Sequence, residues 1–409
     1  MTKTPHPQSA DRQGAPTAPR VLFYSHDTFG LGHLRRSRAL ASAITAANDD
    51  ISSLILTGSP VAGRFTFPAR VDHVRLPGVS KTSSGSYVSQ ALGMHIDDTT
   101  ALRAGLIEAT ARNFSPDLLV VDKEPTGFRG ELLPALRWLR QRGGTQIILG
   151  LRDVLDDPEV LGSEWARKGA REAVEAFYDE IWVYGVQSFY DPTWGLDLSM
   201  QLRKRMHWMG YLRREASALL PRHPLPSWPY IMVTPGGGGD GAAMVDLVLS
   251  AYESAPDLAP GAVVVYGPFL SGAQRQTFEA RAKRLGDRVR TVGFEEQIET
   301  LMAGAQGVVS MGGYNTFCEI LSFDKPAVIV PRTYPRKEQY LRARRAAQLG
   351  LVRFLDKTKG ELTSAAMGRA IRALPGQPPP SQAFFPGLLE GLPYVSARVR
   401  TLLESPKPL

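Results

Sequence analysis

The sequence alternates short, wholly apolar runs with longer amphipathic stretches along most of its length. Apolar strands with helices between them are typical of a parallel sheet that is covered on both faces. The alternation therefore predicts an α/β fold. In the first half the expected strands are Val21–Tyr24, Ser53–Thr57, Val71–Leu76, Leu118–Asp122, Gln146–Leu151 and Ile181–Tyr184, and the expected helices are Leu34–Ala47, Thr99–Asn113, Gly130–Arg140 and Glu164–Phe177.

The alternation stops at Leu220–Pro229, which holds four prolines, and then resumes. A segment so poor in backbone N–H donors is typical of a linker. We therefore expect a flexible leader (1–20), a doubly wound domain (21–219), a linker (220–229) and a second doubly wound domain (230–409). Ligands of such sheets bind beyond the carboxyl ends of the strands, often between domains. The strands expected in the second domain are Tyr230–Thr234, Ala262–Tyr266, Val289–Val292, Gly307–Ser310, Ala327–Pro331 and Leu351–Leu355.

Composition limits the classes of partner. The chain has 48 Lys and Arg residues against 40 Asp and Glu, a formal charge of +8. Such a charge suits nucleic acid, an anionic membrane or a phosphorylated ligand. No aromatic–basic interleaving occurs, so nucleic acid is not an expected partner. The basic clusters Arg35–Arg38, Arg203–Arg205 and Arg344–Arg345 are interpreted as solvated helix faces.

Targeting and redox features favour the cytoplasm. No apolar run reaches the roughly 18 residues of a membrane-spanning helix. The polar Met1–Arg20 segment lacks the apolar core of a secretory signal. A single cysteine, Cys318, excludes an intrachain disulfide and any multi-cysteine metal site.

Two glycine-rich loops follow expected strands. In Gly30–His33, Gly32 would let the backbone approach a ligand, and His33 at the helix start would be a general base or would make a structural hydrogen bond. In Pro235–Gly241, the bare backbone of Gly236, Gly237 and Gly238 would admit a diphosphate or a sugar, the alternative being a flexible turn. No Gly-Lys-Ser/Thr follows, so this loop is not a P-loop.

A third loop carries the most specific pattern, Ser310–Ile320, followed by Glu338-Gln339. Its paired Gly312 and Gly313, with Asn315 and Thr316, would form a helix N-terminus suited to phosphate. Glu319 lies one turn further on, where its carboxylate could accept hydrogen bonds from two ribose hydroxyls. Gln339 opens the next helix and could offer its amide to a sugar.

Polar side chains also follow two strands of the first domain. Asp122, Lys123 and Glu124 follow one strand and Arg152 another. Their position suits binding of a second substrate or, for Asp122, orientation of His33. The alternative is that each caps a helix. Ser25-His26-Asp27 has a similar location.

The series of the four-glycine loop, Val292-Gly293-Phe294, the third loop and Gln339 resembles the donor site of GT-B glycosyltransferases, most closely the glycosyltransferase family 28 C-terminal domain. The resemblance implies two Rossmann-like domains facing across a cleft, with the acceptor on the N-terminal side. It also implies that the main chain near Phe294 holds uracil, Glu319 the ribose, Gly313–Thr316 the diphosphate and Gln339 the donor sugar. His33 would be the base or an acceptor-side stabiliser.

The chain departs from the peptidoglycan enzyme of that family at two places. It has Met311-Gly312 in place of Arg-Ser, and Glu338-Gln339 in place of His-Gln. The identities of the base and of the sugar therefore stay open.

We expect a hexose or N-acetylhexosamine to move from a UDP-sugar to an unidentified acceptor, with lipid-linked and polysaccharide acceptors both open. No D-x-D pair occurs, so metal is not expected, and the UDP-sugar is a co-substrate rather than a cofactor. Retaining relatives carry a Glu where this chain has Met311, which favours inversion. Alternatives on the same fold are a nucleotide-sugar hydrolase, an epimerase and a non-catalytic sensor. Basic clusters such as Arg203–Arg205, near Trp208, would hold the protein at the inner face of the plasma membrane.

Overall fold

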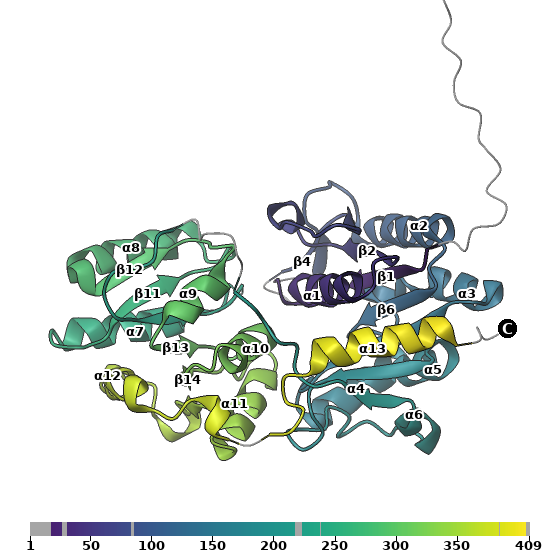
Figure 1. Cartoon of the computed structure of the whole chain (residues 1–409). Helices are drawn as coiled ribbons and strands as arrows, with labels where there is room; N and C mark the ends of the chain where they lie inside the picture. The colour runs from purple at the N-terminus through teal and green to yellow at the C-terminus, as the bar shows by residue number, and fades with distance from the viewer. Residues whose placement is uncertain are drawn as a thin grey trace, which may run out of the picture.

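The computed structural model describes residues 18–26, 31–82, 86–216, 223–237, 239–383 and 385–405. Two α/β domains lie side by side, joined by crossing segments of the chain (Figure 1). Residues 1–17 of the expected leader lie outside the described residues. Among the described helices, none combines the length and apolar character that crossing a bilayer requires.

The N-terminal sheet has seven parallel strands in the order β3-β2-β1-β6-β7-β8-β9. All six expected strands are present. A short hairpin, β4 with β5, and the edge strand β9 were not expected. The strands are β1 (Arg20–Ser25), β2 (Ser52–Thr57), β3 (Val71–Arg75), β4 (Val79–Lys81), β5 (Tyr87–Ser89), β6 (Leu118–Asp122), β7 (Gln146–Arg152), β8 (Glu180–Tyr184) and β9 (Met206–Trp208).

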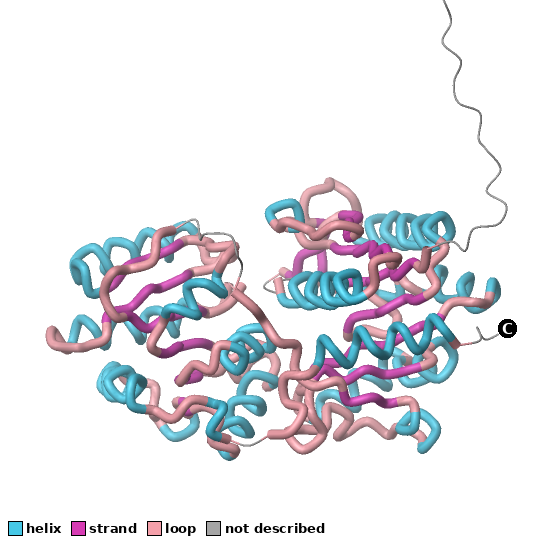
Figure 2. Tube along the Cα trace, viewed as in Figure 1, coloured by secondary structure: helices cyan, strands magenta, loops and turns pink. Residues whose placement is uncertain are grey.

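Helices cover both faces of this sheet because its strands are apolar on both sides (Figure 2). In β1, Val21 and Phe23 pack in one core with α1, and Leu22 and Tyr24 pack in another with α2, α3 and α5. The predicted helix Glu164–Phe177 is two helices, because Gly169 adopts a left-handed backbone with φ of 57°. The helices are α1 (Gly32–Ala47), α2 (Ile96–Phe114), α3 (Leu133–Arg142), α4 (Pro158–Lys168), α5 (Ala170–Phe177) and α6 (Met200–Lys204).

The C-terminal sheet has six parallel strands in the order β12-β11-β10-β13-β14-β15. These strands match the predicted positions, the last two being shorter than expected. They are β10 (Tyr230–Thr234), β11 (Gly261–Val265), β12 (Val289–Val292), β13 (Gly307–Ser310), β14 (Ala327–Ile329) and β15 (Arg353–Phe354). The helices are α7 (Ala242–Ser254), α8 (Gly272–Leu285), α9 (Ile298–Gly304), α10 (Tyr314–Ser322), α11 (Glu338–Gln348) and α12 (Ser364–Ala373).

The last helix, α13 (Gly391–Glu404), packs on the N-terminal domain (Figure 1). Val395, Val399 and Leu402 join the core on the α1 side, and Arg400 donates to the carbonyl of Ala47. The predicted C-terminal domain 230–409 is therefore wrong in its last part. An amphipathic pattern shows that a helix covers a sheet, but it does not show which sheet.

The chain also passes from the N-terminal to the C-terminal domain before it reaches the predicted linker at 220–229. Gly210–Leu212 lies beside Leu388–Gly391, with the Tyr211 N–H donating to the Leu388 carbonyl at 2.7 Å. The backbone N–H of Arg214 already donates to Ser322 in the C-terminal domain, at 2.9 Å. Residues 220–222 lie outside the described residues, and 223–229 run along the C-terminal domain into β10.

Candidate functional site

A cavity of about 410 Å³ lies between the domains, walled by the loops that follow the parallel strands. This is the place where the rule for parallel sheets predicts a ligand site. Asp122, Gly312 and Glu319 lie outside its lining, and Gly238 lies outside the described residues. The predicted residues that line the cavity are Gly32, His33, Lys123, Glu124, Arg152, Gly236, Gly237, Phe294, Gly313, Asn315, Thr316 and Gln339.

His33 and Asp122 are in contact at the N-terminal wall. His33 stands in the first turn of α1 and Asp122 ends β6, and their Nδ1 and Oδ2 atoms are 2.6 Å apart. Arg36, one turn along α1, donates from Nη2 to Asp122 Oδ2 at 2.6 Å and from Nε to Oδ1 at 3.1 Å. Arg36 is only 2% exposed, so the interpretation of its cluster as a solvated helix face is wrong for this residue.

These contacts set the protonation of the pair. Burial lowers the pKa of His33 to about 4, against the opposing pull of Asp122. Burial alone would raise the pKa of Asp122, but the charges of Arg36 and His33 outweigh it and hold that pKa below its usual range. At neutral pH the imidazole is therefore neutral and the carboxylate ionised. With Nδ1–H donating to Asp122, Nε2 is the nitrogen that can accept a proton.

A second histidine belongs to the same wall. His26 follows β1, lines the cavity, and its ring meets that of His33 edge-on at 5.7 Å between centroids. Burial lowers the pKa of His26 to about 3, so it too is neutral. Asp27 lies outside the described residues.

The opposite wall contains the N-terminus of α10. Gly313 precedes this helix, no side chain caps its first turn, and no acidic residue stands there. Uncapped N–H groups and the positive end of the helix dipole favour an anion at this place. The side chain of Asn315 is engaged across the cleft, donating to the Gly32 carbonyl at 3.0 Å and accepting from Arg214 at 3.1 Å.

Glycines allow close backbone approach beside that helix. Gly236 has φ of 81°, and a side chain on Gly267 would meet the Gly236 carbonyl oxygen at 2.3 Å. A side chain on Gly312, with φ of 71°, would meet Ile329 at 2.7 Å. These glycines therefore allow tight packing around the loop. Gly313 differs, because a Cβ atom at its position would meet nothing within 4 Å, so its surface is open.

Glu319 is fully buried behind this wall, and Arg35 from α1 lies against it. One guanidinium nitrogen of Arg35 is 2.6 Å from Glu319 Oε1 and 2.7 Å from Glu299 Oε1. The approach to Glu319 is close but poorly angled, so neither Glu319 oxygen accepts a well-formed hydrogen bond. Burial raises the pKa of Glu319, with Arg35 opposing the rise. A buried carboxylate whose acceptor positions are unmet is suited to receive hydroxyl donors.

Arg35 and Glu299 were missed as site residues in the sequence. Arg35 was assigned to a solvated helix face, and that interpretation is wrong, because it reaches across the cleft to two carboxylates of the other domain. Glu299 is 264 residues away along the chain. No local pattern pairs residues at that distance.

Two predicted residues lie further along the C-terminal wall. Gln339 stands in the first turn of α11 and accepts from the backbone N–H of Arg332 at 3.2 Å, which fixes its amide at the cavity. Phe294 meets Phe65 of the other domain edge-on, at 6.5 Å between ring centroids. Both residues line the cavity.

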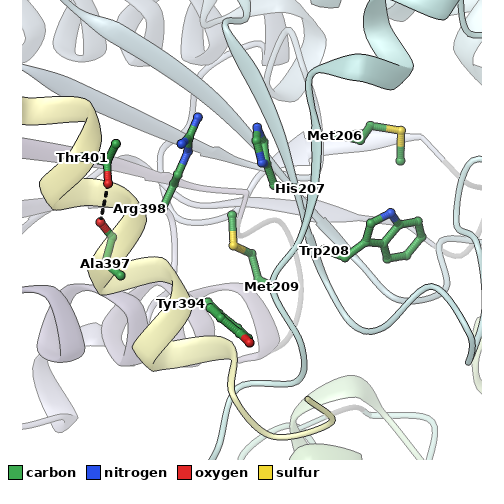
Figure 3. A pocket seen from close by; sticks show the side chains of 8 residues that line it. All are labelled: Met206, His207, Trp208, Met209, Tyr394, Ala397, Arg398 and Thr401. Atoms are coloured by element: carbon green, nitrogen blue, oxygen red, sulfur yellow. Dashed lines mark hydrogen bonds between the residues drawn. The ribbon is translucent and has the colours of Figure 1, made fainter. Parts of the chain in front are cut away.

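The basic cluster at Arg203–Arg205 lies apart from this cleft, at the end of α6. The following strand, β9, and α13 form a separate pocket of about 420 Å³ (Figure 3). Arg203 and Lys204 are exposed, while Trp208 is half-buried in the pocket lining. Membrane association through this face stays a prediction.

Comparison with known proteins supports the fold. Residues 231–369 match the model of the glycosyltransferase family 28 C-terminal domain. No curated protein sequence matches the chain. Among solved structures it is similar to CalG4, the calicheamicin glycosyltransferase, at 18% identity and a TM-score of 0.58, covering 95% of this chain and 99% of that one.

Two further structures share the architecture. MurG of Acinetobacter baumannii is 11% identical with a TM-score of 0.53, over 94% of this chain and 99% of that one. A putative UDP-N-acetylglucosamine 2-epimerase from Listeria monocytogenes is 12% identical with a TM-score of 0.58, over 94% and 96%. At these identities the likeness shows the fold. The chain therefore has the two-domain GT-B fold, and its residues 231–369 are similar to the glycosyltransferase family 28 C-terminal domain.

Proposed function

We propose that the protein is an inverting glycosyltransferase that uses a UDP-sugar. One observation carries the proposal: the neutral His33, oriented by Asp122, lines the same cavity as the uncapped N-terminus of α10. A base on one wall and an anion site on the other are the two parts that displacement of a nucleoside diphosphate requires.

In the proposed reaction, the two walls have the following roles. An acceptor hydroxyl donates its hydrogen bond to Nε2 of His33, and its oxygen attacks the anomeric carbon of the donor from the face opposite the diphosphate. The bond from that carbon to the diphosphate oxygen breaks with its electron pair on the diphosphate. The proton passes to His33, whose positive charge Asp122 stabilises. The helix dipole of α10 and nearby N–H groups stabilise the leaving diphosphate without a metal.

The donor would lie along the C-terminal wall. Glu319 would accept hydrogen bonds from the ribose hydroxyls, once the guanidinium of Arg35 has moved from its oxygen. The backbone around Phe294 would bind the uracil edge, and Gln339 would contact a hexose or an N-acetylhexosamine. The support for this placement is that Phe294, Gly313, Thr316 and Gln339 line one continuous cavity.

The pH dependence of transfer provides one test. Because His33 must be neutral to accept a proton, the rate is expected to be level through the neutral range. It should fall only as the pH drops through about 4, the pKa of His33 in the folded protein. Initial rates at subsaturating substrate measure this limb, with circular dichroism at each pH as the control for unfolding. A limb near 6.5, the ordinary histidine value, would contradict the assignment.

A hydrolase or an epimerase is the second candidate, and the likeness to the putative epimerase fold favours testing it. Incubating the purified protein with UDP-glucose or UDP-N-acetylglucosamine and no acceptor separates the classes. We expect slow turnover that rises when a cell extract supplies acceptors. Rapid release of free sugar and UDP would indicate hydrolysis, and a changed sugar still bound to UDP would indicate epimerisation.

A further inference from the structure

Two cations, Lys123 and Arg152, line the N-terminal wall of the cavity, and Arg152 has no ion-pair partner among the described residues. Arg152, at the end of β7, lines the cavity, and its Nε is buried without a hydrogen-bond partner. Among the described residues, no carboxylate forms an ion pair with its guanidinium. Lys123, directly after β6, lines the same wall and lies 3.4 Å from Glu124, its one ion-pair contact in the described structure.

The acidic groups nearby are already held by other cations. Lys168 binds Glu124 at 2.8 Å and Glu164 at 2.6 Å. Arg336 from the C-terminal domain binds Glu164 as well, at 3.0 Å. Arg336 also pairs with Asp156, at 3.1 Å. The three carboxylates therefore match Lys123, Lys168 and Arg336, and Arg152 is the cation on this wall that has no carboxylate of its own.

One more carboxylate, Glu338, faces Arg152 from the C-terminal domain, but Arg332 holds it at 2.5 Å. Arg332 also binds Asp240 at 2.7 Å, so the whole group belongs to the opposite wall. Glu338 forms no ion pair with Arg152, although its charge acts on that guanidinium and its second oxygen is buried without a hydrogen-bond partner.

Lys123 and Arg152 stand at the ends of the paired strands β6 and β7, where the Lys123 N–H donates to the Gly150 carbonyl at 2.9 Å, so their charges repel each other. Burial lowers the pKa of Lys123 to about 8, and the charges of Arg336 and Arg152 lower it further against Glu124. Burial likewise lowers the pKa of Arg152 to about 10. Burial and mutual repulsion both raise the free energy of the two charged side chains. An anion bound between them would therefore be strongly stabilised.

The backbone places Lys123 there at a cost. Its φ is 71°, a left-handed conformation that a residue with a side chain seldom adopts. Such conformations persist where surrounding structure enforces them and gather at binding sites. Here the conformation holds the ammonium at the cavity, one residue after Asp122.

We propose that the acceptor carries an anionic group, a phosphate or a carboxylate, which binds between Lys123 and Arg152. This inference rests on the proposed function, because it takes the N-terminal wall to be the acceptor side. Arg152 lies near enough to His33 for its charge to lower the pKa of that histidine. The anionic group would therefore sit close to the hydroxyl that His33 activates, and the planar guanidinium would bind it through two hydrogen bonds.

Anion binding can be measured without turnover and without the natural acceptor. The protein is first saturated with UDP, which fills the diphosphate site, and is then titrated with methyl phosphate or acetate by calorimetry. We expect binding that weakens at least about tenfold in Arg152→Met and in Lys123→Met. The probe that binds with the higher affinity, methyl phosphate or acetate, identifies the class of anion. The control is Arg167→Met, which removes the same charge from an exposed position on α4.

Three outcomes decide the proposal. Lost probe binding with unchanged UDP affinity in Arg152→Met supports it. An equal loss of UDP affinity would overturn it, since Arg152 would then bind the donor diphosphate. Probe binding that is absent in the wild type, or that is the same in Arg152→Met and Arg167→Met, would overturn it as well. Wild-type affinity for UDP tests the donor site separately, so failure of the proposed function is recognised independently. Arg152→Lys, which keeps the charge, is expected to retain part of the binding and checks that the fold is intact.

Discussion

Replacing His33 by alanine is expected to lower the rate constant of sugar transfer by about 10² to 10⁴-fold, the range typical for loss of a general base. The affinity for UDP is expected to stay unchanged, because His33 lies on the wall opposite α10. Single-turnover rates with excess protein measure the chemical step, and calorimetry measures UDP binding.

Two further variants make this result specific. Asp122→Asn removes the charge that stabilises protonated His33 but keeps the shape of the side chain. The transfer rate should therefore fall, although the asparagine side chain still lies beside Nδ1 of His33. His207→Ala, in the separate pocket between β9 and α13, should leave the rate unchanged. A loss of less than about tenfold in His33→Ala would move the role of base to another group. His26, whose ring touches that of His33, would be the first to test.

Replacing Glu319 by alanine is expected to weaken UDP binding by roughly 10- to 100-fold, corresponding to about 1–3 kcal/mol of charged hydrogen bonding. The reason is that its two buried oxygens would otherwise receive the ribose hydroxyls. Calorimetry with UDP measures the change.

Glu299→Ala is the matched comparison. It removes the other carboxylate that Arg35 contacts but takes nothing from the proposed ribose site, so UDP binding should fall much less than in Glu319→Ala. Equal losses in both variants would show that Arg35 placement, rather than ribose binding, governs affinity. Unchanged affinity in Glu319→Ala would refute the donor-site assignment. Thermal shifts with UDP, dTDP and GDP then test the identity of the base.

The sequence predicted the parts of the site that depend on local pattern. Parallel strands and the loops after them follow from apolar runs and glycine, and the structure brings Gly32, Gly236 and Gly313, from three predicted loops, to one cavity. Orientation of His33 was one of the roles that the sequence left open for Asp122, and the structure shows the two side chains in contact.

The parts that were not predicted depend on how two separate surfaces meet. Arg35 reaches Glu319 only because the domains are docked, and a run of arginines on a helix gives no sign of that. Whether Arg36 is solvated or buried depends on Asp122, which is 86 residues away. The packing position of α13 depends on which domain has an apolar surface that no other helix covers.

The position of α13 has a consequence for how the protein is made. Val395, Val399 and Leu402 cover part of the apolar surface beside α1. A ribosome delivers the N-terminal domain first, and domains usually fold as they emerge. Here residues 21–219 leave the ribosome while that apolar surface is still exposed to solvent, and it stays exposed until residues 391–404 have been synthesised. The first domain to be synthesised is therefore completed last, and the whole C-terminal sheet is translated while the surface waits for its cover.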